Sequence, residues 1–84
     1  MNHEDLKNDL LWVYQKYLEN PNDRRMREKA RNLHVTFVNE IQNMNGDLQR
    51  AVKLLLNIGY DLSGQPKPSR SEIIHMIKVL RMMN

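Results

Sequence analysis

The sequence predicts an all-α protein, an antiparallel four-helix bundle built as one domain over residues 1–84. Three observations carry this prediction. Apolar residues recur at spacings of three and four in four separate segments, which is the helical period. Short joints containing proline, glycine or asparagine separate these segments. No segment alternates apolar and polar residues in the way that a half-buried strand requires.

The first helix is expected over residues 4–19. Its apolar face consists of Leu6, Leu10, Val13, Tyr14 and Tyr17. Trp12 lies on the opposite, polar face of this helix. We expect the loop over residues 60–68 to cover Trp12; the alternative is that the indole binds a partner, because tryptophan is frequent among interface hot spots.

The second helix is expected to begin at Pro21 or Asn22, with Asn20 as its N-cap, and to end near Asn45. Its apolar seam is Met26, Ala30, Leu33, Phe37, Ile41 and Met44. β-Branched residues in the middle lower helix propensity, so we expect a bend or break near residues 34–36.

Glycine, proline and serine residues mark where the last two helices are expected to begin and end. Gly46 is expected to close the second helix in the left-handed conformation, and a short third helix then runs to Gly59. A loop with two prolines follows over residues 60–68. Ser69 and Glu72 have capping-box spacing, so the fourth helix is expected over residues 70–82.

Charge is distributed unevenly along this mildly basic chain. Thirteen Lys and Arg residues face ten Asp and Glu residues, giving a net charge of +3. The first helix is acidic, whereas the C-terminal part and the start of the second helix are basic. The basic residues that begin the second helix are Arg24, Arg25, Arg27, Lys29 and Arg31. We interpret them first as a solvated face; the alternative is a patch that binds phosphate, anionic lipid or an acidic partner.

The fourth helix is apolar almost all round. Ile73, Ile77 and Leu80 are expected to face the bundle core. The remaining apolar positions are Ile74, Met76, Val79, Met82 and Met83. Either this helix is central, or these residues form an interface for a protein partner or a second copy of the chain. Together with Trp12, Lys67 and Arg70, they form the predicted partner-binding set.

The sequence contains no catalytic pattern that we can identify. Cysteine is absent, and no phosphate-binding loop, zinc-protease motif or nucleophile elbow is present. The three histidines are far apart in sequence. We therefore expect a non-enzymatic protein with no metal and no cofactor. The acidic N-terminal segment and the lack of a long apolar run predict a cytoplasmic protein without a membrane-spanning segment.

Four short motifs stand out along the chain: Leu10-Leu11-Trp12-Val13-Tyr14, Leu18-Glu19-Asn20-Pro21, the Gly46-Asp47 step and Gln65-Pro66-Lys67-Pro68-Ser69. They resemble the corresponding segments of the pediocin-like bacteriocin immunity proteins. The resemblance implies a cytosolic four-helix bundle, placed at the inner face of the membrane, that protects its producer at a sugar-transport receptor held by the bacteriocin. It also implies that the C-terminal half carries specificity. The alternatives are a nucleic-acid-binding phage or plasmid regulator that uses the basic start of the second helix, and a homo-oligomeric assembly subunit.

Overall fold

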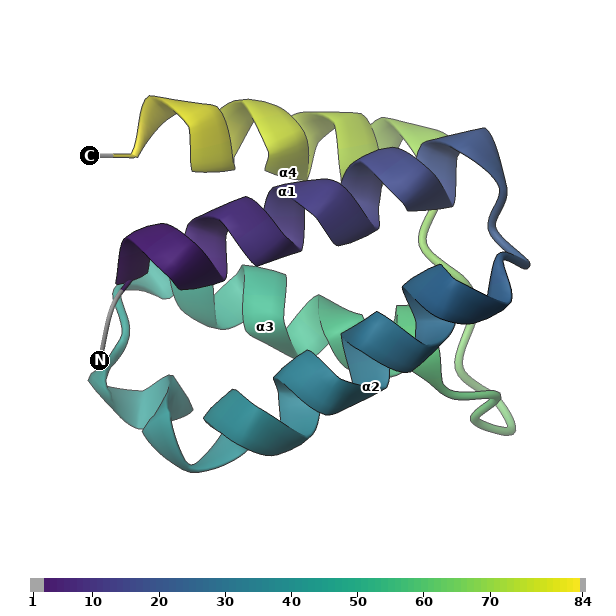
Figure 1. Ribbon diagram of the computed structural model, residues 1–84, viewed down its shortest axis with the longest axis horizontal. Helices are drawn as coiled ribbons and strands as arrows, with labels where there is room; N and C mark the ends of the chain where they lie inside the picture. Colours follow the sequence, from purple (N-terminus) through teal and green to yellow (C-terminus); the bar gives the residue numbers. More distant parts are fainter. Residues whose placement is uncertain (1–2, 84) are drawn as a thin grey trace.

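The computed structural model describes residues 3–83, and all of its regular structure is helical over that range. The elements are α1 (His3–Glu19), α2 (Arg24–Phe37), the 3-10 helix η1 (Val38–Asn43), α3 (Gly46–Gly59) and α4 (Arg70–Met82). Figure 1 shows α1 and α4 side by side and running in opposite directions, with α2 and α3 beneath them. The prediction of an all-α helical bundle is therefore confirmed.

Helix α1 packs the face that its apolar spacing predicts. Leu6, Leu10 and Val13 are fully buried. Two tyrosines on the same face also donate hydrogen bonds through their hydroxyl groups. The Tyr14 hydroxyl donates to the carbonyl of Ala51 in α3. The Tyr17 hydroxyl donates to the Pro68 carbonyl at 2.8 Å, which fixes the chain just before α4 begins.

The N-cap of α2 is Asp23, so the prediction that Asn20 caps this helix is wrong. The Asp23 side chain accepts a hydrogen bond from the Met26 amide at 3.1 Å. Asn20 instead stabilises the turn before the helix, because its side-chain oxygen accepts from the Asn22 amide at 3.0 Å. The Asn20 side-chain oxygen therefore stabilises the turn and does not cap the helix. Helix α2 begins at Arg24, after the Asp23 cap.

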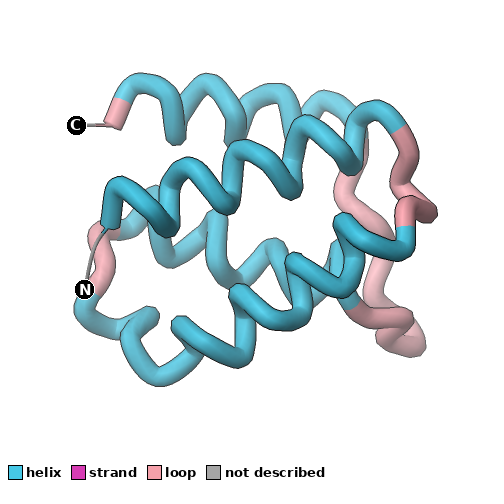
Figure 2. Tube along the Cα trace, viewed as in Figure 1, coloured by secondary structure: helices cyan, strands magenta, loops and turns pink. Residues whose placement is uncertain are grey.

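The long second helix changes geometry at Phe37. There the α-helix ends, with φ −110° and ψ 1°, and η1 follows (Figure 2). The Thr36 hydroxyl donates back to the Asn32 carbonyl at 2.8 Å, a contact that often bends helices. The expected break thus lies one residue beyond the predicted stretch, at residue 37.

Gly46 begins α3 rather than closing the preceding helix, so that prediction is also wrong. Asn45 is the N-cap, and its side chain accepts from the Leu48 amide at 2.9 Å. Among the residues that the structure describes, only Gly64, in the loop, has a positive φ, of 79°. Two other predictions hold: α3 ends at Gly59, and Ser69 caps α4 by accepting from the Glu72 amide at 3.1 Å.

One apolar core joins the four α-helices. Helix α4 contributes Ile73, Met76, Ile77 and Leu80 to it. The buried face of α4 is wider than predicted, because α4 packs against both α1 and α3. Within residues 3–83, no helix combines the length and the apolar character needed to cross a bilayer.

Candidate protein-docking site

The apolar residues predicted to form an interface on α4 do not share one surface. Met76 is only 2% exposed and belongs to the core, so its assignment to the surface is wrong. Val79 and Met83 are half-buried and pack against the core. Ile74 and Met82 remain, at 40% and 82% exposed. The exposed apolar surface of α4 is therefore smaller than the sequence indicates.

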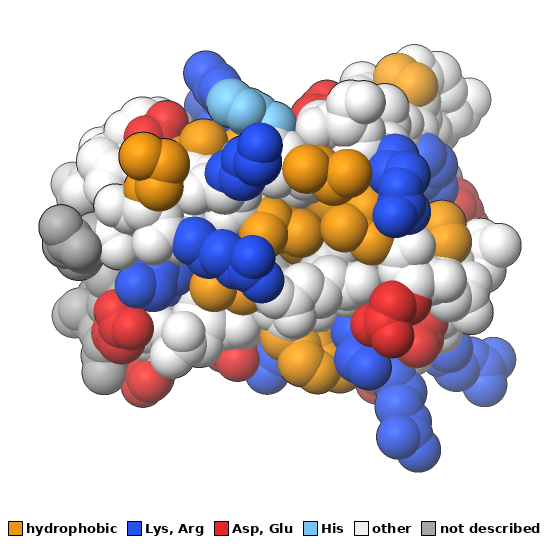
Figure 3. Space-filling view, turned by 90° about the horizontal axis from the view of Figure 1, so that it is seen from above, with side chains coloured by type: hydrophobic (Ala, Val, Ile, Leu, Met, Phe, Trp, Pro, Cys, Tyr) orange, Lys and Arg blue, Asp and Glu red, His pale blue; other side chains and the backbone are white. Residues whose placement is uncertain are grey.

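A groove between α1 and α4 brings one of these residues together with others that the sequence did not single out. It has a volume of about 330 Å³ and is lined by Gln15, Leu18, Ile74, Ile77, Lys78 and Arg81. Figure 3 shows hydrophobic side chains along the middle of this face, with Lys and Arg side chains around them. The floor is apolar and the rim is basic.

Neither cation on the rim has a counterion among residues 3–83. Lys78 and Arg81 are exposed, and neither forms an ion pair or hydrogen bond with another residue in the described range 3–83. They follow Ile74 and Ile77 by four positions, so each stands one helical turn beyond an apolar residue of the floor. That i,i+4 spacing is the sequence signal that could have identified the rim.

Arg70 lies at the end of the same two helices, but it has a structural partner. Its Nη1 atom donates to the Leu18 carbonyl at 3.3 Å. Leu18 is in the last turn of α1, where unsatisfied carbonyls give the helix a partial negative charge. Arg70 therefore ties the start of α4 to the end of α1 beside the groove.

Trp12 lies away from this groove, and the loop over residues 60–68 does not cover it. The indole is 39% exposed and lines a shallow hollow with Asn8, Asp9 and Lys29. Lys16 Nζ stands 6.0 Å from the centre of its ring. The expectation of a loop cover is wrong because the neighbour on this side is α2, held by an ion pair of 3.4 Å between Lys29 and Asp9.

The loop that was expected to cover Trp12 is held against α2 instead. Asp61 bridges two cations, at 3.0 Å from Arg27 Nη2 and 3.3 Å from Lys67 Nζ. Hydrogen bonds from Arg27 and then Lys67 lower the pKa of Asp61 below its ordinary value. Lys67 also donates to the Tyr60 carbonyl at 3.1 Å. Lys67 therefore closes its own loop and does not join the α1–α4 groove.

The basic cluster at the start of α2 is divided between internal and exposed roles. Lys29 and Arg27 form the ion pairs described above, and Arg31 Nη1 donates to the Gly59 carbonyl at 2.9 Å. Arg24 and Arg25 are exposed and have no partner among the residues that the structure describes. Internal contacts thus account for three of the five cations.

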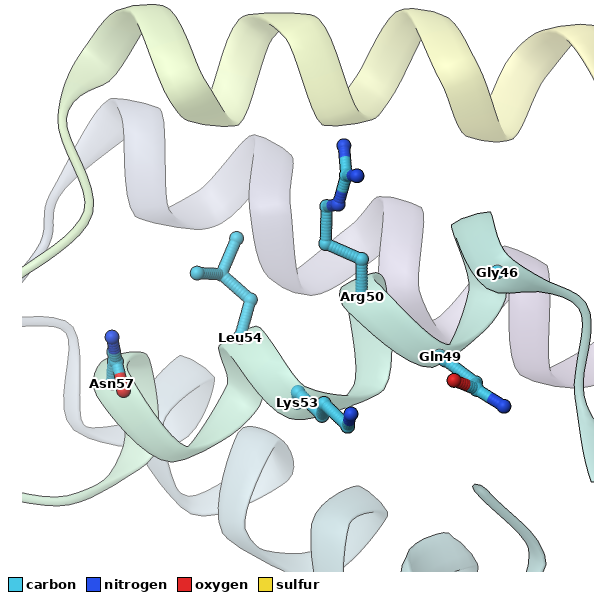
Figure 4. A pocket seen from close by; sticks show the side chains of 6 residues that line it. All are labelled: Gly46, Gln49, Arg50, Lys53, Leu54 and Asn57. Carbon is cyan, nitrogen blue, oxygen red and sulfur yellow. The ribbon is translucent and has the colours of Figure 1, made fainter. Parts of the chain in front are cut away.

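Another hollow, of about 430 Å³, follows the outer side of α3 and is lined by Gly46, Gln49, Arg50, Lys53, Leu54 and Asn57. In Figure 4 Arg50 and Leu54 point toward α4, whereas Gln49 and Lys53 point away from it. Its polar groups do not converge, unlike those of a typical ligand site. Over residues 3–83, no three His, Asp or Glu side chains form a cluster that could hold a metal ion.

No protein-family model, curated protein or solved structure matches this chain. The functional assignment therefore rests on the residues and their arrangement.

Proposed function

We propose that this chain is a non-catalytic interaction protein of the bacteriocin-immunity type. It docks through the α1–α4 groove onto a receptor–bacteriocin complex at the cytoplasmic face of the membrane. One observation carries the proposal: an apolar floor containing Leu18 and Ile74 lies beside two cations, Lys78 and Arg81, that have no counterion within residues 3–83. The motif resemblance along α1 and in the Gln65–Ser69 segment supports the choice of protein class.

The groove favours a partner helix with one apolar and one acidic face. Its long direction follows two adjacent antiparallel helices, and a third helix can pack along such a seam at about 8–10 Å between axes. Apolar side chains of the partner would cover Leu18 and Ile74. Carboxylates on its flank would pair with Lys78 and Arg81, because charge complementarity sets orientation and suppresses wrong partners.

The proposal is tested by protection of a bacteriocin-sensitive strain. The chain is expressed in that strain, which is then challenged with a panel of pediocin-like bacteriocins, and survival is counted. We expect protection from the wild-type chain and a loss of at least about tenfold, or 1.4 kcal/mol, with Ile74→Glu. The new carboxylate would interrupt the apolar floor, and it would pair with Lys78 four residues on, the cation that the partner's carboxylate is expected to meet. Val35→Glu is the matched control, because Val35 is 65% exposed on α2, away from the groove.

Two outcomes would contradict different parts of the proposal. If the folded wild-type chain protects against none of the panel, the immunity role is wrong. If Ile74→Glu protects as well as Val35→Glu, immunity stands but the groove is not the docking site. Circular dichroism of both variants establishes that each is folded.

Self-association through the same groove is less favourable than binding of an acidic partner. A symmetric dimer would bring Lys78 and Arg81 of both copies to one interface, where like charges repel. Sedimentation at several protein concentrations separates the two cases, because a dimer would show a concentration-dependent mass. Nucleic-acid binding would rest mainly on Arg24 and Arg25, and a flat dependence on salt would exclude it.

A further inference from the structure

The N-terminal half of α2 contains a polar hollow that the proposed docking function does not use. Its volume is about 220 Å³, and Asn22, Arg24, Arg27 and Arg31 line it. The three arginines are spaced by three and four residues, so they share one face of the helix. A water molecule occupies about 30 Å³ in the liquid, so the hollow has room for a group of several heavy atoms.

Two of these guanidinium groups are fixed in place by the fold. Arg27 Nη2 is 3.0 Å from the Asp61 carboxylate, and Arg31 Nη1 donates to the Gly59 carbonyl at 2.9 Å. Fixed donors lose less conformational entropy when a ligand arrives. Arg24, in contrast, is exposed and has no partner among the described residues.

Cations outnumber carboxylates around the hollow by one. The cations are Arg24, Arg27, Arg31 and Lys67; the carboxylates are Asp61, Asp23 and Glu28, which follows Arg24 by four positions and forms no ion pair within the described range. Asp61 is the only carboxylate in an ion pair with this face of α2 in the described chain, and it is shared with Lys67 at 3.3 Å. Asp23 is close in sequence, but its side chain accepts from the Met26 amide as the helix cap. Arg24 also begins α2, where the helix dipole disfavours a cation. Internal contacts explain Arg27 and Arg31, but they leave Arg24 unexplained.

We propose that this hollow binds a phosphate group, with Arg24 as the side chain that closes over it. Arginine suits this ligand because its planar fork can donate two parallel hydrogen bonds to phosphate oxygens. Arg27 and Arg31 supply fixed positive charge below the ligand, and Arg24 pairs with it from the rim. The phosphate belongs either to a free phosphate ion or to a lipid headgroup, since both present the same oxygens. This site is separate from the α1–α4 groove and does not depend on it.

Two adjacent arginines provide a matched test. Arg24 lines the hollow, whereas Arg25 is exposed and does not line it, so Arg24→Gln and Arg25→Gln remove the same charge one residue apart. Sodium phosphate is titrated against sodium chloride at equal ionic strength, and backbone amide shifts are followed by NMR. We expect saturable shifts over residues 22–31 and 59–61 with phosphate only. Arg24→Gln should weaken binding about tenfold, and Arg25→Gln less than about twofold.

A second arm identifies the source of the phosphate. Binding is measured to vesicles of phosphatidylglycerol and, as a control, of phosphatidylcholine. Preference for phosphatidylglycerol that is lost with Arg24→Gln and kept with Arg25→Gln assigns a lipid headgroup; saturable binding of the free ion without vesicle binding assigns soluble phosphate. Equal losses in both variants, or no saturable binding in either arm, would overturn the proposal. Ile74→Glu should bind phosphate normally, which separates this result from any failure of the docking function.

Discussion

Gly59 and Arg31 are in direct contact where α3 passes α2. Arg31 Nη1 donates to the Gly59 carbonyl at 2.9 Å, and a Cβ atom added to Gly59 would lie 2.9 Å from Arg31 Cγ and 3.0 Å from the Arg31 amide nitrogen. The backbone of α3 therefore approaches α2 too closely for a side chain. Space, rather than backbone conformation, requires glycine at this position.

Gly59→Ala should destabilise the protein by about 1–3 kcal/mol, because the added methyl group must displace backbone as well as side-chain atoms. The measurement is urea denaturation followed by circular dichroism. Gly46→Ala is the control, since a Cβ at that position meets nothing within 4 Å apart from its chain neighbours and the nearby backbone of its own helix. It should be neutral or stabilising by up to about 1 kcal/mol. Equal losses in the two variants would contradict the close approach.

The identity of the α2 cap predicts different effects for two neighbouring polar residues. Asp23→Ala removes the acceptor for the Met26 amide and should cost about 1 kcal/mol of unfolding free energy. Asn20→Ala removes only an exposed contact to the Asn22 amide and should cost less than about 0.5 kcal/mol. Chemical denaturation of both variants compares them directly. The reverse order would restore Asn20 as the cap.

The same substitution at two methionines of α4 should have a large effect on stability at one and almost none at the other. Met76→Glu places a carboxylate in the core and should lower the unfolding free energy by more than about 3 kcal/mol. Met82→Glu changes a side chain that is 82% exposed and should alter stability by less than about 0.5 kcal/mol. Thermal unfolding of both variants provides the measurement. A tolerated Met76→Glu would mean that α4 does not pack on this face.

Tyr14 predicts a loss of stability in alkaline solution. Burial, and then the charge of Glu72, raise its pKa above the ordinary value of about 10. Above about pH 10 the folded state therefore keeps the proton of the Tyr14 hydroxyl, whereas the unfolded state releases it. The contribution of Tyr14 to the unfolding free energy is fully present below about pH 10 and falls as the pH rises further. Tyr14→Phe should cost about 1 kcal/mol at neutral pH, because the hydrogen bond to Ala51 is lost.

The test of Tyr14 is the difference in unfolding free energy between the two proteins as the pH rises. That difference should shrink above about pH 10, because only the wild-type chain has this hydroxyl to ionise. Tyr17, whose pKa is raised for the same reasons, remains in both proteins. A difference that stays constant across the alkaline range would contradict the role of Tyr14.

The lowered pKa of Asp61 predicts that the unfolding free energy also depends on pH in acidic solution, although less strongly than in alkaline solution. Its hydrogen bonds to Arg27 and Lys67 lower its folded-state pKa below the unfolded value of about 3.9. The stabilisation is therefore present above about pH 4 and is lost as the pH falls through the folded-state pKa. Asp61→Asn should be less stable than wild type at neutral pH and equal to it in strong acid. If the unfolding free energies of wild type and Asp61→Asn differ by the same amount at both pH values, the role of the ion pairs is contradicted.

Local sequence signals locate the helices, but they do not decide between two similar cap residues that stand close together. Spacing alone placed Leu6 and Leu10 in the core, and the Ser69–Glu72 pair located the start of α4. Asn20 and Asp23 are both good cap residues, and the turn at Pro21 decides between them.

The candidate site was harder to predict because its parts come from different helices. The sequence pointed to Ile74, but the groove also needs Leu18 from α1, and that pairing depends on how α1 and α4 align. The helical wheel places Met76 on the surface because it assumes one covering neighbour, whereas α4 packs against two helices.

The 3-10 geometry of η1 sets the distance that the chain covers between α2 and α3. At about 2.0 Å per residue, its six residues advance about 12 Å, whereas an α-helix of the same length would advance about 9 Å. The tighter winding therefore supplies about 3 Å of extra reach without an extra residue. A deletion in this segment would shorten the span that brings Met44 into the core, so the length of η1 controls the register of α3 against its neighbours.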